Sequence, residues 1–400
     1  MKVLCLSNGH GEDRVASFIA RELIQLGIET VALPMVGNGF CYANLAVPLV
    51  TELQQSLPSG GFSRMSAYQL WRDVQGGLLS LTWRQWQITQ NWVRTNPQGL
   101  VLAVGDIVPL LLAWLSGARY AFVATAKSEY YWRDRRGAVP FGGSIFYPWE
   151  RWLMGRKRCL VNLVRDQLTA EHLTKNYKGL SVEYLGNPMM DGLESTGVDL
   201  GIAKNQWVIA ILPGSRPPEA YHNWQTLLVC AQVALRVLPP PVHFLGAIAP
   251  SLDLEIFAQH SAQKGWVRTD ATTFVQPQAR LKLVTDHFAD CLQLSHLALA
   301  MAGTATEQMV GLGKPVITIP GSGPQFTRKF ALEQSYLLGI GVNLIDKPAQ
   351  TAEVIKRMLT DGDYFHMLVK NARERMGTPG ASRRIAQRLA SIASPGKNKE

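Results

Sequence analysis

Asp106 is the first residue whose type and position are suited to catalysis. It follows the apolar run Leu100–Val104, which has the composition of a buried strand, and it precedes an apolar stretch that begins at Val108. A carboxylate at the end of a buried strand can act as a general base. Aspartate is also favoured as the cap of a helix, here one that begins near Val108. Catalysis and capping do not exclude each other, so both roles stay open for Asp106.

A histidine flanked by glycines follows the first apolar run, Val3–Ser7. Gly9 and Gly11 flank His10, and Glu12 lies in the first turn of the helix expected next. Glycines at a strand-to-helix turn let a ligand approach the backbone, and a helix N-terminus favours anions. His10 could therefore act as a base or as a hydrogen-bond donor to a substrate. The structural alternative is a tight turn whose acidic residues favour the helix N-terminus.

The second half of the chain contains a loop with the composition of a phosphate site. It follows the apolar run Trp207–Leu212 and consists of Pro213, Gly214, Ser215 and Arg216. Glycine allows close approach, serine offers a hydroxyl, and the planar guanidinium matches two phosphate oxygens. We expect this loop to bind phosphate, with a polar surface loop as the alternative.

Two further glycine-bearing loops could complete a nucleotide-sugar site. The first opens a helix after the run Leu297–Met301, where backbone N–H groups could hold a phosphate and a carboxylate could bind a ribose. Its residues are Gly303, Thr304, Ala305, Thr306 and Glu307. The second spans residues 320–326. Gln325 in this loop and Thr327 directly after it are candidates for sugar hydroxyls. Three such loops at the strand ends of one sheet are a stronger signal together than any one alone.

These motifs stand at the ends of short apolar runs that alternate with helical stretches. Such runs are typical of parallel strands covered on both faces. The remaining expected strands are Tyr120–Ala124, Cys159–Val164, Val182–Leu185, Val242–Leu245 and Pro315–Ile319. The expected helices are Glu12–Leu26, Trp83–Thr95, Val108–Ser116, Gln167–Tyr177, Ala220–Val237, Leu252–Ala262, Thr306–Leu312 and Phe326–Leu338.

Two successive series of this kind predict an α/β protein with two Rossmann-like domains that face each other across a ligand-binding cleft. The apolar periodicity stops between Asn187 and Asn205, a stretch that contains three glycines. We therefore expect an N-terminal domain over residues 1–190 and a C-terminal domain over residues 206–393. Residues 394–400 form a polar tail that we expect to be flexible.

Composition excludes several classes of protein. Apolar residues make up 47% of the chain, which is too many for intrinsic disorder of its bulk. No apolar run approaches the roughly 20 residues that cross a bilayer. The five cysteines are far apart in the sequence, which excludes a disulfide scaffold and argues against a metal site. We expect a cytoplasmic protein that has no resident metal or cofactor and whose net charge is +10.

The segment 127–158 combines positive charge with aromatic side chains. It contains eight Lys or Arg residues, three acidic residues and eight aromatic residues. Basic side chains attract anionic lipid headgroups, and Trp and Tyr favour the membrane interface. We expect this segment to dock the first domain on an anionic membrane surface. Nucleic acid is disfavoured as a partner, since no nucleic-acid-binding motif accompanies the segment. The alternative is a set of core aromatic residues beside a solvated run of charges.

Taken together, the motifs resemble the GT-B glycosyltransferases, and within them the lipid-A-disaccharide synthases. The resemblance covers residues 2 to 390 and rests on three segments: Leu212–Arg216, Gly303–Glu307, and Leu185–Pro188 with Asp191. It implies that a nucleotide-sugar, as a UDP-sugar, binds to the second domain and that a membrane lipid is the acceptor. It further implies inverting transfer of a hexosyl or N-acetylhexosaminyl group without a tightly held metal.

By the same resemblance, the diphosphate would be faced by Arg216, Ser215, Thr304 and Ala305. Glu307 would face the ribose, and Asp106 matches the region of the catalytic aspartate. The turn around His10 differs from that of the synthases, which instead have a Gly-Glu-x-Ser-Gly-Asp turn near their start. We therefore expect a different membrane lipid as acceptor, with Gly9, Gly11 and Glu12 in the acceptor loop. Two other functions stay open: a nucleotide-sugar 2-epimerase and a non-catalytic nucleotide-sugar-binding protein.

Overall fold

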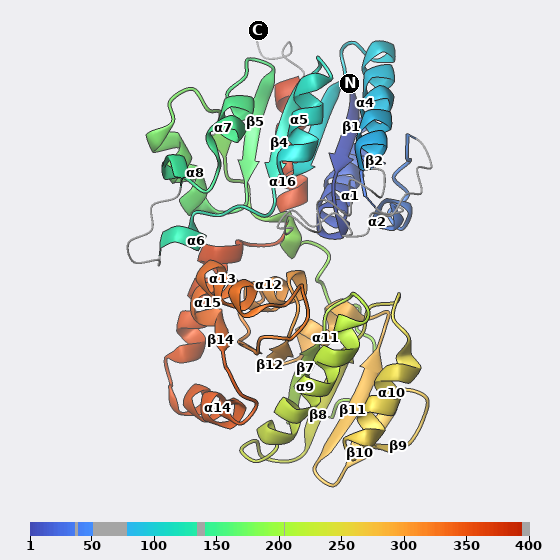
Figure 1. Ribbon diagram of the computed structural model, residues 1–400, viewed down its shortest axis with the longest axis vertical. Helices are drawn as coiled ribbons and strands as arrows, with labels where there is room; N and C mark the ends of the chain where they lie inside the picture. Colours follow the sequence, from blue (N-terminus) through green and yellow to red (C-terminus); the bar gives the residue numbers. More distant parts are fainter. Residues whose placement is uncertain (37–38, 51–77, 134–140, 204, 394–400) are drawn as a thin grey trace. The chain divides into compact units, whose positions relative to one another are not determined.

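The computed structural model describes residues 1–36, 39–50, 78–133, 141–203 and 205–393. They form two α/β units. The first unit comprises Met1–Asp191 and the segment from Thr378 onward, and the second comprises Gly192–Gly377. Figure 1 shows both units with their helices and strands labelled. The predicted tail, residues 394–400, lies outside the described residues.

The first unit is built on a parallel sheet. Its described residues give six strands in the order β2-β1-β3-β4-β5-β6. The strands are β1 (Lys2–Ser7), β2 (Glu29–Pro34), β3 (Leu100–Gly105), β4 (Arg119–Ala124), β5 (Cys159–Val164) and β6 (Val182–Glu183). The helices are α1 (His10–Gln25), α2 (Phe40–Ala43), α4 (Leu78–Thr95), α5 (Ile107–Leu115), α6 (Tyr130–Arg133), α7 (Pro148–Met154), α8 (Gln167–Asn176) and α16 (Ala381–Ala393). Short 3₁₀ turns lie at Phe141–Gly143 and Pro188–Met190.

Helices cover both faces of this sheet, which explains why its strands are apolar throughout. Side chains of a strand alternate between the two faces. In β1, Leu4 and Leu6 pack with residues of α4, α5 and α7, whereas Val3 and Cys5 pack with residues of α1 and α16. Each strand of the sheet therefore needs apolar residues at consecutive positions.

The second unit contains a mixed sheet. Within the described residues its order is β14-β13-β12-β7-β8-β11-β10-β9, parallel except for the antiparallel strands β9 and β10 at one edge. The strands are β7 (Trp207–Leu212), β8 (Val242–Ala247), β9 (Val267–Arg268), β10 (Thr273–Gln276), β11 (Ala279–Val284), β12 (Leu297–Ala300), β13 (Val316–Thr318) and β14 (Val342–Leu344). The helices are α9 (Glu219–Ala234), α10 (Leu254–Gln263), α11 (Phe288–Leu294), α12 (Thr304–Gly311), α13 (Arg328–Leu338), α14 (Gln350–Thr360) and α15 (Tyr364–Met376), with a 3₁₀ turn at Gly339–Gly341.

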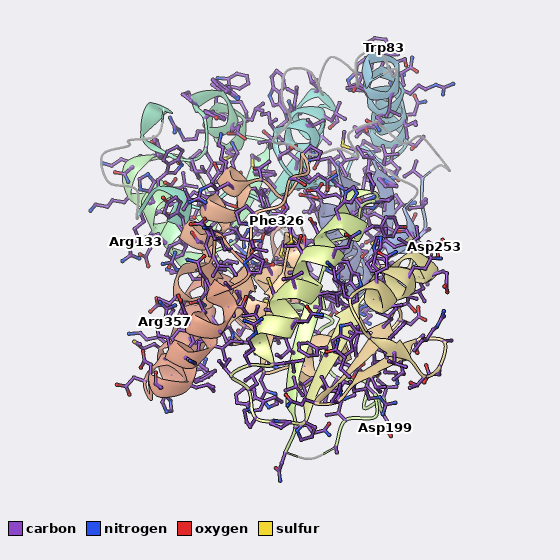
Figure 2. All side chains as sticks on the ribbon, turned by 60° about the horizontal axis from the view of Figure 1, so that its bottom comes forward. Trp83, Arg133, Asp199, Asp253, Phe326 and Arg357 are labelled. Carbon is purple, nitrogen blue, oxygen red and sulfur yellow. The ribbon has the colours of Figure 1, made fainter. Side chains whose placement is uncertain are left out.

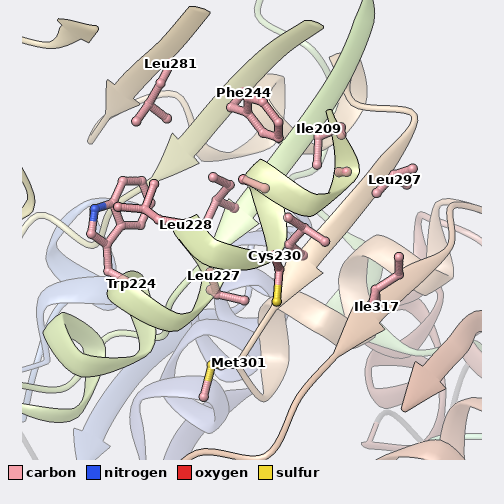
Figure 3. Close-up of a cluster of buried hydrophobic side chains, with 14 of the residues drawn as sticks. Ile209, Trp224, Leu227, Leu228, Cys230, Phe244, Leu281, Leu297, Met301 and Ile317 are labelled. Carbon is pink, nitrogen blue, oxygen red and sulfur yellow. The ribbon is translucent and has the colours of Figure 1, made fainter. Parts of the chain in front are cut away.

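Helix α9 is anchored deeply in the core of the second unit. Trp224, Leu227 and Leu228 are buried against Ile209 and Phe244 of the central strands, as Figure 3 shows. Burial of each large apolar side chain contributes about 1.5–3 kcal/mol. The helix that follows the Gly214 loop is thus held rigidly on the sheet.

The C-terminal helix is the main difference from the predicted domains. The expected second domain extended to residue 393, but α16 packs on α1 of the first unit. Ile385 and Leu389 of α16 are buried in the first unit's core. Asp191 accepts hydrogen bonds from the amides of Gly380, Ala381 and Ser382 at the start of α16. The amphipathic pattern of a helix does not reveal which sheet it covers, so the sequence could not place α16.

The expected strands and helices are present, with shifted ends. The expected strand Val182–Leu185 is limited to Val182–Glu183. The apolar runs of the sequence did not predict the strands β2, β9, β10, β11 and β14 or the helices α2, α6, α7, α11, α14, α15 and α16.

Candidate functional site

The three glycine-bearing loops of the second unit follow three neighbouring strands. β12 pairs with β7 on one side and with β13 on the other, and Ala300 is in register with both Leu212 and Thr318. All three strands are parallel, so their carboxyl ends meet at one edge of the sheet. The structure therefore brings together the loops that the sequence analysis singled out, at the edge where ligands bind in open α/β sheets.

The Gly214 loop turns sharply at the end of β7. Gly214 has φ of +97°, and a Cβ at this position would lie 3.3 Å from the carbonyl oxygen of Met301. Glycine is required here both for the left-handed conformation and for the close approach to the β12 loop. Beyond the turn, Ser215 is exposed and Arg216 is half-buried. Both side chains lie at the same sheet edge as the β12 loop.

Helix α12 begins directly after Gly303. The amides of Thr306 and Glu307 bond to the carbonyl oxygen of Gly303, which leaves the earlier amides, of Thr304 and Ala305, pointing along the helix axis at its N-terminus. Such an end carries partial positive charge and favours an anion. Glu307 is half-buried in the first turn.

Thr306 differs from its predicted role as a ligand contact. Its side chain is fully buried, and its hydroxyl donates a 2.7 Å hydrogen bond to the carbonyl oxygen of Ala302. Thr306 is thus a structural residue of the first turn of α12, because its hydroxyl is used by the backbone. The sequence pattern could not distinguish a hydroxyl that faces a ligand from one that faces the backbone.

The loop of residues 320–326 is held by a residue that the sequence analysis missed. The carboxylate of Glu219 accepts hydrogen bonds from the amides of Gln325 and Phe326. Gln325 itself is half-buried. Asn223, also missed, donates 3.0 Å and 3.5 Å hydrogen bonds to the carbonyl oxygens of Pro213 and Met301. The only sequence signal for Glu219 was an acidic residue directly before the expected helix Ala220–Val237.

In the first unit, Asp106 is the cap of α5, as the sequence suggested. One carboxylate oxygen accepts a 2.9 Å hydrogen bond from the amide of Val108 and a 2.6 Å hydrogen bond from the side-chain amide of Asn8. A Cβ on Gly105 would lie 2.1 Å from Oδ1 of Asn8. Gly105 has φ of +129°, so glycine is needed there for two reasons. Asn8 is a further residue that the sequence analysis missed.

The electrostatic surroundings of Asp106 suit a general base. Burial raises the pKa of Asp106 above its usual value, and the hydrogen bonds from Val108 and Asn8 partly offset that rise. The negative charge of Glu150 raises this pKa further, and the positive charge of Lys127 lowers it. Lys127 forms an ion pair with Glu150. A carboxylate whose pKa is raised toward neutrality is a stronger base than an exposed one.

The turn that contains His10 lies beside Asp106. Strands β1 and β3 are neighbours, with Ser7 in register with Val104. His10 is exposed at the start of α1, and Glu12 is half-buried and accepts a 3.4 Å hydrogen bond from the hydroxyl of Thr125. The structure therefore places both candidate bases at the carboxyl edge of the first sheet.

Two comparisons with known proteins bear on this arrangement. In sequence, the chain is 26% identical over 280 residues to the lipid-A-disaccharide synthase of Syntrophotalea carbinolica, covering 62% of this chain and 67% of that protein. It is 24% identical over 267 residues to the lipid-A-disaccharide synthase of Trichlorobacter lovleyi, covering 60% of this chain and 66% of that protein. These matches span about two thirds of the length of the curated relatives. No family model matches the chain.

Solved structures match over nearly the whole chain. The UDP-bound MnaA of Staphylococcus aureus has a TM-score of 0.63 at 14% identity and covers 100% of this chain and 98% of its own. The calicheamicin glycosyltransferase CalG4 has a TM-score of 0.62 at 12% identity and covers 99% of both chains. The UDP-GlcNAc 2-epimerase of Neisseria meningitidis, bound to UDP-GlcNAc, has a TM-score of 0.59 at 14% identity. It covers 98% of this chain and 100% of its own.

The chain has the GT-B fold and resembles the lipid-A-disaccharide synthases. This combination supports a glycosyltransferase, although epimerases share the fold. Among the described residues of this GT-B protein, no group of three His, Cys, Asp or Glu side chains could hold a metal ion. No helix in the described ranges is long and apolar enough to cross a membrane.

The segment 127–158 of this GT-B protein is divided between core and surface. Tyr130 and Phe146 are buried, in contrast to the expected membrane-facing role, whereas Tyr147, Trp149 and Trp152 are exposed. Arg158 donates hydrogen bonds to the carbonyl oxygens of Ala118 and Trp114 and thereby holds backbone in place. Three charged residues that the sequence analysis counted, Asp134, Arg135 and Arg136, lie outside the described residues, as does the side chain of Phe141.

Proposed function

We propose that the protein transfers a hexosyl or N-acetylhexosaminyl group from a UDP-sugar to a hydroxyl of a membrane lipid. The observation that carries this proposal is the convergence of the Gly214 loop, the N-terminus of α12 and the loop of residues 320–326 at one sheet edge. The similarity to lipid-A-disaccharide synthases supports a lipid acceptor. The UDP and UDP-GlcNAc in related structures support a uridine nucleotide.

The reaction would be a single displacement that inverts the anomeric carbon. Asp106 would take the proton of the acceptor hydroxyl as the new carbon–oxygen bond forms and the bond to the diphosphate breaks. His10 is the alternative base or a partner of Asp106. Negative charge grows on the departing diphosphate, and the guanidinium of Arg216 and the N-terminus of α12 would stabilise it. Glu307 would bind the ribose.

A nucleotide-sugar 2-epimerase is the second candidate, because UDP-GlcNAc 2-epimerases share this fold. The two functions differ in their need for an acceptor. We expect purified protein to label a lipid product when it is given radiolabelled UDP-sugars and a total lipid extract. Conversion of UDP-GlcNAc to its 2-epimer without lipid would establish the epimerase instead. Binding of the nucleotide-sugar with no conversion of any kind would indicate a non-catalytic binding protein.

A lipid acceptor requires the protein to reach a membrane, and we propose that the first unit does so peripherally on the cytoplasmic side. Trp149 of α7 and Trp83 of α4 are 53% and 58% exposed, and Leu111 of α5 is 40% exposed. α4, α5 and α7 pack on the same face of the sheet, and Figure 2 labels Trp83 on α4. Exposed apolar side chains on adjacent helices, with an exposed Lys157 three residues after the end of α7, match an anionic membrane surface.

Vesicle co-sedimentation tests this docking. The test variant carries Trp149→Ser, Arg156→Glu and Lys157→Glu. It spares Arg158, because the hydrogen bonds of Arg158 to Ala118 and Trp114 join separate segments of the unit. The control variant carries Met367→Ser, Lys356→Glu and Lys370→Glu, which likewise change one apolar and two basic residues, on α14 and α15 of the second unit.

Each basic residue near an anionic surface contributes about 1 kcal/mol. We expect the test variant to lose binding to vesicles that contain anionic lipid, and the control variant to bind like the natural protein. Equal binding by all three proteins would refute the assigned surface.

A further inference from the structure

We infer that Glu219 and Asn223 of α9 are positioning residues that hold the three loops of the proposed donor site in one relative arrangement. The two residues are four positions apart and so lie on the same face of the helix. Neither belongs to the residues proposed to contact the nucleotide-sugar. This inference rests on the proposed function, since it assigns a role within the same site.

Asn223 connects the first two loops. It is 4% exposed, and its side-chain amide donates a 3.0 Å hydrogen bond to the carbonyl oxygen of Pro213, before Gly214, and a weaker one of 3.5 Å to that of Met301, before Gly303. If either loop moved away, the buried amide of Asn223 would lose an acceptor, and an unsatisfied buried donor costs about 1–3 kcal/mol. The amide therefore favours the arrangement in which both loops stay in place.

Glu219 connects α9 to the third loop. It is 8% exposed, and its carboxylate accepts hydrogen bonds from the amide of Gln325 at 3.2 Å and from that of Phe326 at 2.8 Å. Hydrogen bonds to a carboxylate are stronger than those between neutral groups. The contact is also close, because a Cβ on Gly323 would lie 2.5 Å from Cδ of Glu219. The glycine therefore allows the loop to rest directly on the carboxylate.

The position of Glu219 couples this loop to the phosphate loop. Arg216 lies three residues earlier, and its carbonyl oxygen accepts a 2.9 Å hydrogen bond from the amide of Ala220. The start of α9 is thus continuous with the loop proposed to bind the diphosphate. The carboxylate of Glu219, at this start, holds the loop proposed to bind the sugar. Loss of the Glu219 carboxylate should release residues 320–326, whereas Asn223 would keep the other two loops together.

The test compares two probes, UDP and UDP-GlcNAc, by calorimetry. Glu219→Gln removes the negative charge and replaces one acceptor oxygen by an NH2 group, which cannot accept a hydrogen bond from the amide of Gln325. We expect the affinity for UDP-GlcNAc to fall roughly 10- to 150-fold, the range for a lost hydrogen bond to a charged group. The affinity for UDP should stay within about threefold. Glu353→Gln is the matched control, since Glu353 is an exposed glutamate in the first turn of α14, and it should change neither affinity.

Gly323→Ala provides a second variant that leaves Glu219 in place. Its added methyl group would displace the same loop from the other side, so the same selective loss is expected. If Glu219→Gln does not fold, Gly323→Ala decides the question. An equal loss for both probes, or no loss for either, would overturn the inference. A natural protein that binds neither probe would instead overturn the proposed function.

Discussion

Replacement of Asp106 by asparagine separates its proposed catalytic role from its structural one. One carboxylate oxygen of Asp106 accepts hydrogen bonds both from the amide of Val108 and from the side chain of Asn8. Asparagine retains an acceptor oxygen of the same geometry but cannot take a proton from a substrate. Asparagine and aspartate are about equally good helix caps. The free energy of unfolding should therefore change by no more than about 0.5 kcal/mol.

The expected effect on turnover is much larger. Loss of a general base slows a reaction by about 10²- to 10⁴-fold. At 1.36 kcal/mol for each factor of ten, this corresponds to about 2.7–5.4 kcal/mol in the activation barrier. Because burial raises the pKa of Asp106, activity of the natural protein should fall with decreasing pH at values above the usual range of an aspartate. That acid limb should disappear in Asp106→Asn.

Two further variants complete the experiment. Asp106→Ala removes the cap and should cost about 0.5–2 kcal/mol in unfolding free energy in addition to turnover. Asp253→Asn changes the same residue type at the cap of α10 and should leave turnover unchanged. Steady-state kinetics of sugar transfer and thermal unfolding are the measurements. Normal turnover by Asp106→Asn, together with an inactive His10→Ala, would refute the assignment and identify His10 as the base.

Three other predictions follow from the two sites. Arg216→Ala should weaken binding of nucleoside diphosphates about 10- to 150-fold, as calorimetry would show, and an unchanged affinity would exclude Arg216 from the site. Gly105→Ala should displace the side chain of Asn8 and reduce turnover, because its Cβ would lie 2.1 Å from Oδ1 of Asn8. Burial raises the pKa of Asp13 to about 8, from 3.8 in the unfolded chain. Between these values only the folded state holds the proton, so the free energy of unfolding should fall as the pH rises from about 4 to 8. Asp13→Asn should remove this decline. Thermal melts of both proteins over this pH range are the measurement, and an equal pH dependence of stability in the two would contradict the prediction.

Much of the local structure could be predicted from the sequence, because its signals are local. Apolar runs such as Leu100–Val104 and Trp207–Leu212 indicate strands that are buried on both faces, and these strands are present. Gly105 and Gly214 mark the strand ends, since their backbone conformations are unfavourable for other residues. The residue types in the loops therefore predicted the kind of chemistry before any fold was known.

Exposure of individual side chains could not be predicted in the same way. Phe146 and Trp149 are three residues apart in one aromatic segment, yet the first is buried and the second is 53% exposed. Thr306 has the residue type of a ligand contact but donates its hydroxyl to the backbone. Burial depends on which helix and strand pack together, and composition carries no information about that.

The sequence by itself determined the strands, the turn glycines and the chemical character of the loops, because each depends on residues close together in the chain. The tertiary structure alone decided which of them meet. Asn8 contacts Asp106 across 98 positions, and Glu219 holds Gln325 across 106. Such contacts arise from strand order and helix packing, which place distant segments at one sheet edge. The same physical reason assigns α16 to the first unit, since its apolar face is buried only there.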